Sequence, residues 1–277
     1  MKAAILFDLD ELQFIEPDFE TLTDDRYTLK LLEIEARTAR LLINENEWPI
    51  AVAFETAQGW IAGNFIYRRI NAELLDKLEN MDIEIYQERQ AEWETAVREY
   101  YSLKLMRNVV PALDDFSQER ADNLLRVIDD LWHNVVDRNC FDAACGTGIG
   151  SYVVRMYGMS VISFDKDPSL LVCGMRTGRL LPECTMCIDA SEASKFVKKA
   201  PFGLLLMAGE ITQFNALQWR RIVSEVLELA NDTIITTGTK TEATMIRQWS
   251  LEKGRNVEMI EDESSNFYDR WICHVKE

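Results

Sequence analysis

Apolar and polar residues follow two different patterns along the chain. From residue 117 onward, short apolar runs alternate with amphipathic stretches of helical period, and the run 202–209 is almost entirely apolar, as a buried parallel strand is. This alternation predicts an α/β domain whose seven-stranded, mostly parallel, doubly wound sheet carries helices on both faces. The last two strands are expected at 257–260 and 270–275, with the final one antiparallel.

Residues 1–112 differ, because their apolar residues recur mainly at helical spacing. The stretch from Asn71, a good helix cap, to about Met106 contains no proline or glycine and predicts one long helix. Residues 50–65 fit a helix and a strand equally well. Pro111 marks the boundary between a mainly helical N-terminal domain, 1–112, and an α/β domain, 113–277.

The predicted helix 71–106 has an apolar face that needs a partner. Leu74, Leu78 and Trp93 lie near this face, and the opposite face is mostly Glu, Gln and Arg. Packing within its own domain is favoured, because the heptad spacing lapses near Arg89. A homodimer seam through this helical region is the alternative.

The most informative stretch joins an apolar strand, 139–143, to a helix that begins near Ser151. Gly146, Gly148 and Gly150 lie between them, and glycines allow the close approach of backbone to a ligand. The sixth position counted from Gly146 is Ser151, so the dinucleotide fingerprint fails. Asp142, just before the turn, would repel a pyrophosphate and attract a cation. The turn therefore predicts a ligand with a positive amino group and few phosphates.

On these residues the chain resembles the class I S-adenosylmethionine-dependent methyltransferases, whose first motif reads roughly acid-x-Gly-x-Gly-x-Gly. Here Asp142 is the acid and Ala144 stands at the first glycine position. Further matches follow in order, because Asp165 ends a second strand 19 positions after Gly146, Asp189 ends a third, and 202–209 forms a fourth. The resemblance covers about residues 117–277.

The resemblance implies a site for S-adenosylmethionine (SAM). The turn after Asp142 would hold the methionine part, Asp165 the ribose, and Asp189 the adenine. The loop after the fourth strand would lie where substrate meets the methyl group, and Glu210 in this loop is the candidate catalytic acid or base. A merely solvated glutamate is the alternative. The expected cofactor-binding residues are Asp142, Ala143, Ala144, Cys145, Gly146, Thr147, Gly148, Asp165, Lys166, Asp189, Ala190 and Ala208.

The implied function is a SAM-dependent methyltransferase. No Asn/Asp-Pro-Pro-Tyr motif follows the fourth strand, so methylation of a planar amide or adenine nitrogen is not indicated. The acceptor is left open between a small molecule and a protein, and the N-terminal domain is expected to cover the pocket or to recognise the acceptor. A non-catalytic SAM-binding regulatory or scaffold protein is the alternative. Ser151 and Asp142 disfavour an NAD-dependent oxidoreductase.

Composition narrows the partners and the location. The 277 residues are 47% hydrophobic, enough for a real core, and the formal net charge of −17 disfavours a nucleic-acid partner. No apolar run is long enough to span a membrane, and the N-terminus is too short and acidic for a signal peptide, which predicts a cytoplasmic protein. Cys184 and Cys187 have metal-like spacing but lie in an apolar strand, so no metal site is expected.

Overall fold

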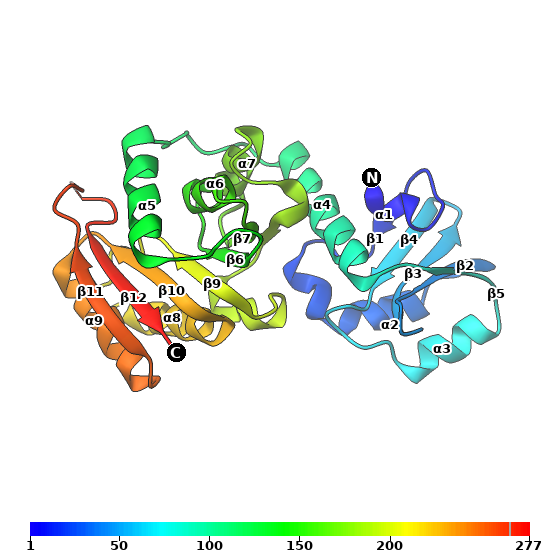
Figure 1. The fold of residues 1–277 in the computed structure, drawn as a ribbon. Coiled ribbons are helices and arrows are strands. Elements are labelled where there is room, and N and C mark those ends of the chain that lie inside the picture. Colours follow the sequence, from blue (N-terminus) through cyan, green and yellow to red (C-terminus); the bar gives the residue numbers. More distant parts are fainter. Residues whose placement is uncertain (266) are drawn as a thin grey trace. The chain divides into compact units, whose positions relative to one another are not determined.

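The structure is a computed structural model that describes residues 1–265 and 267–277 (Figure 1). The chain forms two compact units, Met1–Lys104 and Leu105–Glu277. The division falls inside helix α4 (Gln90–Asn108), whereas the sequence placed it at residue 112. Among the described residues, no helix combines the length and the apolar character needed to cross a membrane.

The described part of the second unit is built on a seven-stranded sheet with the order β11-β12-β10-β9-β6-β7-β8. Strand β12 is antiparallel to both of its neighbours, and the other pairs are parallel. The predicted α/β fold, with its antiparallel final strand, is confirmed. The strands are β6 (Asn139–Ala143), β7 (Ser160–Asp165), β8 (Thr185–Cys187), β9 (Ala200–Leu205), β10 (Ala230–Thr237), β11 (Asn256–Glu261) and β12 (Trp271–Lys276).

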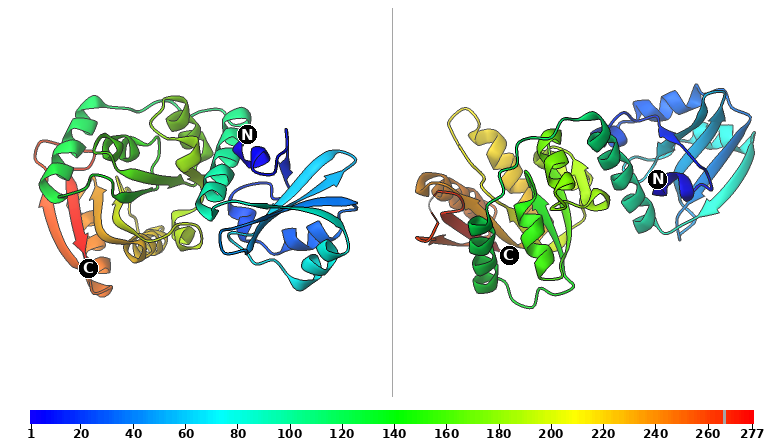
Figure 2. Two further views of the ribbon diagram at one scale, coloured as in Figure 1. Left: turned by 45° about the vertical axis from the view of Figure 1, so that its right-hand side comes forward. Right: turned by 90° about the horizontal axis from the view of Figure 1, so that it is seen from above.

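Helices cover both faces of this sheet, with α5, α6 and α7 on one face and α8 and α9 on the other (Figures 1 and 2). Side chains fix where several of them begin, since Ser117 and Asp167 accept hydrogen bonds from backbone N–H groups of α5 and α7, and Thr239 forms a capping box with Glu242. The helices are α5 (Gln118–Leu131), α6 (Ile149–Met156), α7 (Pro168–Arg176), α8 (Ala216–Leu229) and α9 (Lys240–Glu252), with the 3-10 helices η2 (Pro182–Cys184) and η3 (Ala190–Lys195).

The first unit is organised around a five-stranded sheet with the order β1-β4-β3-β2-β5. Its strands are β1 (Gln13–Phe14), β2 (Thr38–Ile43), β3 (Pro49–Thr56), β4 (Gly59–Asn64) and β5 (Asp82–Gln87). Its helices are α1 (Lys2–Ile5), η1 (Glu20–Thr23), α2 (Arg26–Leu32), α3 (Ala72–Glu79) and the first part of α4. Helices do occur in this unit, but the expectation of a mainly helical domain has to be corrected because it omitted the sheet at its centre.

Burial explains why the sequence did not reveal this sheet. Strand β3 is buried at five consecutive positions, 50–54, so its sequence lacks the alternation that marks a half-exposed strand. The predicted single helix 71–106 is also wrong, since α3 ends at Glu79 and β5 follows, pairing in parallel with β2. Polar and apolar residues alternate along 82–85 with the period of a strand. The pairing of this segment with β2 outweighs the helical preference of the residues on either side of it.

Three of the apolar residues that suggested a dimer seam, Leu74, Leu78 and Trp93, are buried within the first unit. Leu74 and Leu78 pack in its core, and Trp93 is fully buried. The Trp93 ring meets Phe7 edge-on at 5.5 Å, and its Nε1–H donates to Asn64 Oδ1 at 2.8 Å. The apolar face therefore packs within its own unit, as the favoured reading of the sequence has it.

Candidate functional site

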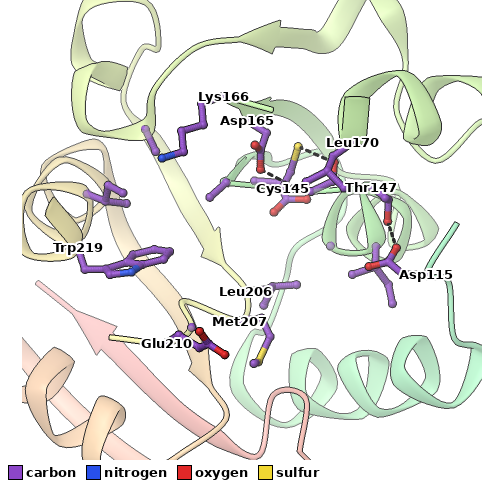
Figure 3. Close-up of a pocket in the computed structure, with 18 of the residues that line it drawn as sticks. Asp115, Cys145, Thr147, Asp165, Lys166, Leu170, Leu206, Met207, Glu210 and Trp219 are labelled. Atoms are coloured by element: carbon purple, nitrogen blue, oxygen red, sulfur yellow. Dashed lines mark hydrogen bonds between the residues drawn. The ribbon is translucent and has the colours of Figure 1, made fainter. Parts of the chain in front are cut away.

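A cavity of about 570 Å³ opens at the carboxyl ends of the parallel strands of the second unit (Figure 3). In open α/β sheets this edge is where ligands bind. Most of the predicted site residues line this cavity: Asp142, Ala144, Cys145, Gly146, Thr147, Asp165, Lys166, Asp189, Ala190 and Glu210. Ala143, Gly148 and Ala208 do not line it. The fold thus brings residues from four strand ends together, while their binding roles stay predictions.

The turn between β6 and α6 has left-handed backbone at alternate positions. The φ angles of Ala144, Gly146 and Gly148 are 47°, 55° and 86°, a region that favours glycine. At Gly148 a side chain would also collide with Leu180, because an added Cβ would lie 2.5 Å from Leu180 Cδ2. The glycines of this turn are therefore explained by left-handed backbone angles and, at Gly148, by close packing. Ala144 adopts the same left-handed conformation although its Cβ makes that conformation unfavourable.

Asp142 is the buried acid at the base of this turn. Its Oδ2 accepts hydrogen bonds from the backbone N–H and the hydroxyl of Ser151, both at 2.7 Å. Its Oδ1 is buried and has no hydrogen-bond partner among the described residues. Burial raises the pKa of Asp142 to about 6, with the Ser151 hydrogen bonds opposing the shift. Ser151, which breaks the dinucleotide fingerprint, is therefore the residue that holds Asp142.

Asp165 joins the glycine turn to the end of β7. Its two oxygens accept from the backbone N–H groups of Gly146, at 2.9 Å, and Asp167, at 2.8 Å. A carboxylate oxygen has two lone pairs, so each keeps one for a ligand. Burial raises the pKa of Asp165, and these backbone hydrogen bonds oppose the shift. The carboxylate is thereby fixed in orientation and available to a pair of hydroxyl groups.

Asp189 and Lys166 line the cavity together with Asp165, and these residues form one wall of it. Asp189 caps η3 by accepting from Ser191 N–H at 2.8 Å, so part of its hydrogen-bonding capacity is structural. Ala190, beside it, is buried and lines the cavity with a small apolar surface. Lys166 directly follows Asp165 and is exposed. This wall therefore offers an apolar surface flanked by one acid and one base.

The loop after β9 is held tightly although it has no regular structure. Met207 N–H donates to Thr236 Oγ1 at 2.7 Å, and Ile211 N–H donates to Glu242 Oε1 at 3.1 Å. The Asn215 side chain donates to the Glu210 carbonyl oxygen at 2.8 Å. Met207 and Glu210 both have left-handed backbone, with φ of 54° and 44°. Such strain persists only where the surroundings enforce it, and it is common at functional sites.

A charged network that the sequence did not reveal also reaches the cavity. Arg120, in the first turn of α5, donates to Asp269 through Nε at 2.5 Å and Nη2 at 3.3 Å, and its guanidinium lies 5.3 Å from the Tyr268 ring centroid. Asp269 also accepts from the hydroxyl of Thr236. Arg120 and Tyr268 line the cavity. No local signal marks these residues, because Arg120 and Asp269 lie 149 positions apart.

A second missed contact ties the linker before α5 to the glycine turn. Thr147 Oγ1 donates to Asp115 Oδ1 at 2.6 Å, and Asp115 lines the cavity. Arg179 donates to the Thr147 carbonyl oxygen at 2.9 Å and forms an ion pair with Asp114 at 2.6 Å. This ion pair lowers the pKa of Asp114. The turn is thus braced from both sides.

The described residues contain no group of three or more His, Cys, Asp or Glu side chains that could hold a metal ion. None of the six cysteines, all of which are among the described residues, forms a disulfide in the structure. Burial raises the pKa of the Cys145 thiol in the glycine turn. The cavity therefore offers carboxylates, two cations and apolar surface.

No protein-family model and no curated protein matches the chain. Among solved structures, it is similar to magnesium protoporphyrin IX methyltransferase from Synechocystis PCC 6803 with bound SAM, at 16% identity and a TM-score of 0.46, over 66% of this chain and 97% of that one. It is also similar to precorrin-6y C5,15-methyltransferase from Geobacter metallireducens, at 12% identity and a TM-score of 0.43, over 62% and 95%. At such identities the similarity concerns the fold alone.

Proposed function

We propose that the second unit binds SAM and transfers its methyl group to an acceptor. The observation that carries the proposal is made on Asp142, which lines the cavity and whose Oδ1 is buried without a hydrogen-bond partner among the described residues. An unsatisfied buried acceptor is costly unless a ligand donor completes it. The positive amino group of the methionine part of SAM is such a donor.

The other residues of the cavity fit the remaining parts of SAM. Arg120 uses Nε and Nη2 for Asp269, which leaves the other edge of its guanidinium for the carboxylate of the methionine part. Asp165 offers an acceptor to each of the two ribose hydroxyls. Ala190, flanked by Asp189, supplies an apolar surface for adenine. The amino acid, ribose and base are thus each matched by groups of the right chemistry.

The chain's own contribution to methyl transfer is position and exclusion of water. SAM carries its methyl group on a positively charged sulfur and supplies an already activated donor. Leu206 and Met207 present apolar surface to the cavity beside Glu210, whose loop is held by Thr236 and Glu242. Holding two reactants in line in such an environment lowers the activation barrier by several kcal/mol, about 7–11 kcal/mol in favourable cases. Glu210 is the candidate for receiving a proton from the acceptor.

The acceptor is proposed to be a small molecule or a protein, and the first unit to cover the cavity or to recognise that acceptor. The net charge of −17 disfavours a nucleic-acid acceptor. The alternative is a SAM-binding regulatory protein without turnover, which would bind SAM but transfer no methyl group. Transfer of a labelled methyl group from SAM into a heat-inactivated cell extract separates the two, because a regulatory protein leaves such an extract unlabelled.

Calorimetric titration with SAM and with S-adenosylhomocysteine (SAH) tests the proposal directly. We expect both to bind, and we expect Asp142→Asn to weaken SAH binding about 10- to 100-fold, since it removes a charge-assisted hydrogen bond while keeping the shape of the side chain. Glu258→Gln, at an exposed position of β11, is the matched control and should bind as the wild type does. A folded wild-type protein that binds neither compound would exclude the proposed function.

A further inference from the structure

The charged side chains that line the cavity differ in whether they have partners. Asp115, Asp142 and Asp165 accept hydrogen bonds from Thr147, Ser151 and backbone N–H groups, and Arg120 pairs with Asp269. Asp189 caps η3. Among the described residues of the lining, Glu210 and Lys166 are the charged side chains that carry neither a hydrogen bond nor an ion pair. Both side chains are exposed, so water solvates them in the free protein and a bound molecule of opposite charge would replace that water.

These two free charges lie on different walls (Figure 3). Lys166 follows directly on Asp165 at the end of β7 and acts electrostatically on it, so it belongs to the half of the cavity assigned to the nucleoside. Glu210 lies in the loop after β9, and Trp219 lies on α8, which follows that loop. Figure 3 draws the Trp219 ring between the Lys166 and Glu210 side chains. The half assigned to the acceptor thus presents the Glu210 carboxylate, with the indole ring at its border.

Glu210 is presented to the cavity by a constrained backbone. Its carbonyl oxygen accepts from the Asn215 side chain at 2.8 Å, and the next N–H, that of Ile211, donates to Glu242 at 3.1 Å. Glu242 is itself buried and caps α9. The carboxylate is therefore tethered to a fixed backbone, so a ligand that pairs with it does not have to order the loop.

We propose that the acceptor is an amine, bound as its ammonium ion, with an apolar body. This proposal rests on the proposed function and assigns the substrate class of the same site. The Glu210 carboxylate pairs with the ammonium group, and the Trp219 ring, which lines the same cavity, attracts the cation. For transfer, the ammonium group first gives one proton to Glu210. The freed nitrogen lone pair then attacks the methyl carbon of SAM as its bond to sulfur breaks, which leaves SAH and the methylated ammonium ion. Leu206, Met207 and Ile222 give the apolar body a surface. A carboxylate acceptor would be repelled by Glu210 and would find its free cation only at Lys166, in the nucleoside half.

Three probes with one body and different head groups test the charge preference. The full chain, saturated with SAH, is titrated in a calorimeter with 2-phenylethylamine, 2-phenylethanol and phenylacetate. We expect the amine to bind at least about tenfold more tightly than the other two, the size expected for a charge-assisted contact. Equal affinities, or no binding of any of the three, would overturn the inference. Tighter binding of phenylacetate, lost in Lys166→Met, would overturn it in favour of an anionic acceptor.

Two variants assign the preference to one side chain. Glu210→Gln should reduce the preference for the amine over the alcohol by at least about tenfold, and Glu258→Gln, an exposed glutamate outside the cavity, should retain it. An unchanged preference in Glu210→Gln would contradict the inference. The SAH titration of each protein reports whether the cavity is intact. A wild type that fails to bind SAH would exclude the proposed function and this inference together, whereas SAH binding without amine preference would exclude the inference alone.

Discussion

The two carboxylate oxygens of Asp142 have different surroundings, and this difference suits the proposed binding of a ligand's amino group. One oxygen is held by Ser151, and the other is buried without a partner. Burial raises the pKa of Asp142 to about 6, so its charge changes close to neutral pH. In the free protein, a carboxyl whose pKa is raised on folding contributes stability below its unfolded pKa, and this contribution is lost as pH rises through about 6.

Ligand binding has the opposite pH dependence, because a cationic amino group needs the ionised carboxylate. We expect the Kd of SAH to be constant above about pH 7 and to rise as pH falls through 6, approaching about tenfold per pH unit. Calorimetric titrations between about pH 5 and 8 measure this. Asp142→Asn should remove the dependence over this range. A wild-type profile that stays flat down to pH 5 would show that Asp142 does not face the amino group.

Ala144 is a second residue whose local state has a measurable consequence. Its φ of 47° is unfavourable for a residue with a Cβ. Ala144→Gly should therefore raise the free energy of unfolding by up to about 1 kcal/mol, measured by urea denaturation. Ala143→Gly, at the buried last position of β6, is the matched control and should lower it, because glycine loses more backbone entropy on folding and the substitution removes a buried methyl group. A loss of stability in Ala144→Gly would show that the methyl group's packing outweighs the strain.

At the scale of elements, the cavity depends on connections between segments far apart in the chain. Thr236, at the end of β10, accepts from Met207 N–H and donates to Asp269, which pairs with Arg120 of α5. The Thr236 hydroxyl thus connects the loop after β9, the segment before β12 and the start of α5. The loop that carries Glu210 begins at one end of the network, so its position depends on the neighbouring strand more than on its own sequence.

The same strand offers a matched pair of threonines to test this. Thr236→Val removes the acceptor of Met207 N–H and should lower the free energy of unfolding by about 1–3 kcal/mol. Thr233 is equally buried, but its hydroxyl has no hydrogen-bond partner among the described residues, so Thr233→Val should be neutral or stabilising. Urea denaturation measures both. Equal effects of the two substitutions would mean that the Thr236 hydroxyl does not brace the loop.

At the scale of the whole molecule, every described residue that lines the cavity belongs to the second unit. The last residues of α4 belong there too, because Leu105, Met106 and Val109 pack against a core cluster that includes Leu171 and Leu180. The cofactor half of the proposed site is therefore expected to form from residues 105–277 alone.

A fragment of residues 105–277 tests this expectation. We expect it to fold and to bind SAH within about threefold of the full chain, since a compact unit with its own core folds by itself. Circular dichroism and calorimetric titration measure the two properties. A fragment that folds but binds SAH much more weakly would show that the first unit contributes directly to the cofactor site.

The sequence by itself determined the α/β fold of the second unit and the residues of the glycine turn. These follow from local constraints, because apolar periodicity marks each element and the left-handed backbone needs glycine at Gly146 and Gly148. Asp142 and Asp165 were predictable for the same reason, since they end strands at fixed spacing around that turn.

Only the tertiary structure decided the rest. Arg120, Thr236 and Asp269 form one network although Arg120 lies more than a hundred residues before the other two, and no local pattern encodes such a meeting. The sheet of the first unit was hidden because β3, buried on both faces, loses the alternation by which a strand is recognised. Its parallel pairing of β2 with β5 likewise depends on contacts between segments about 40 residues apart, which the chain makes only once it has folded.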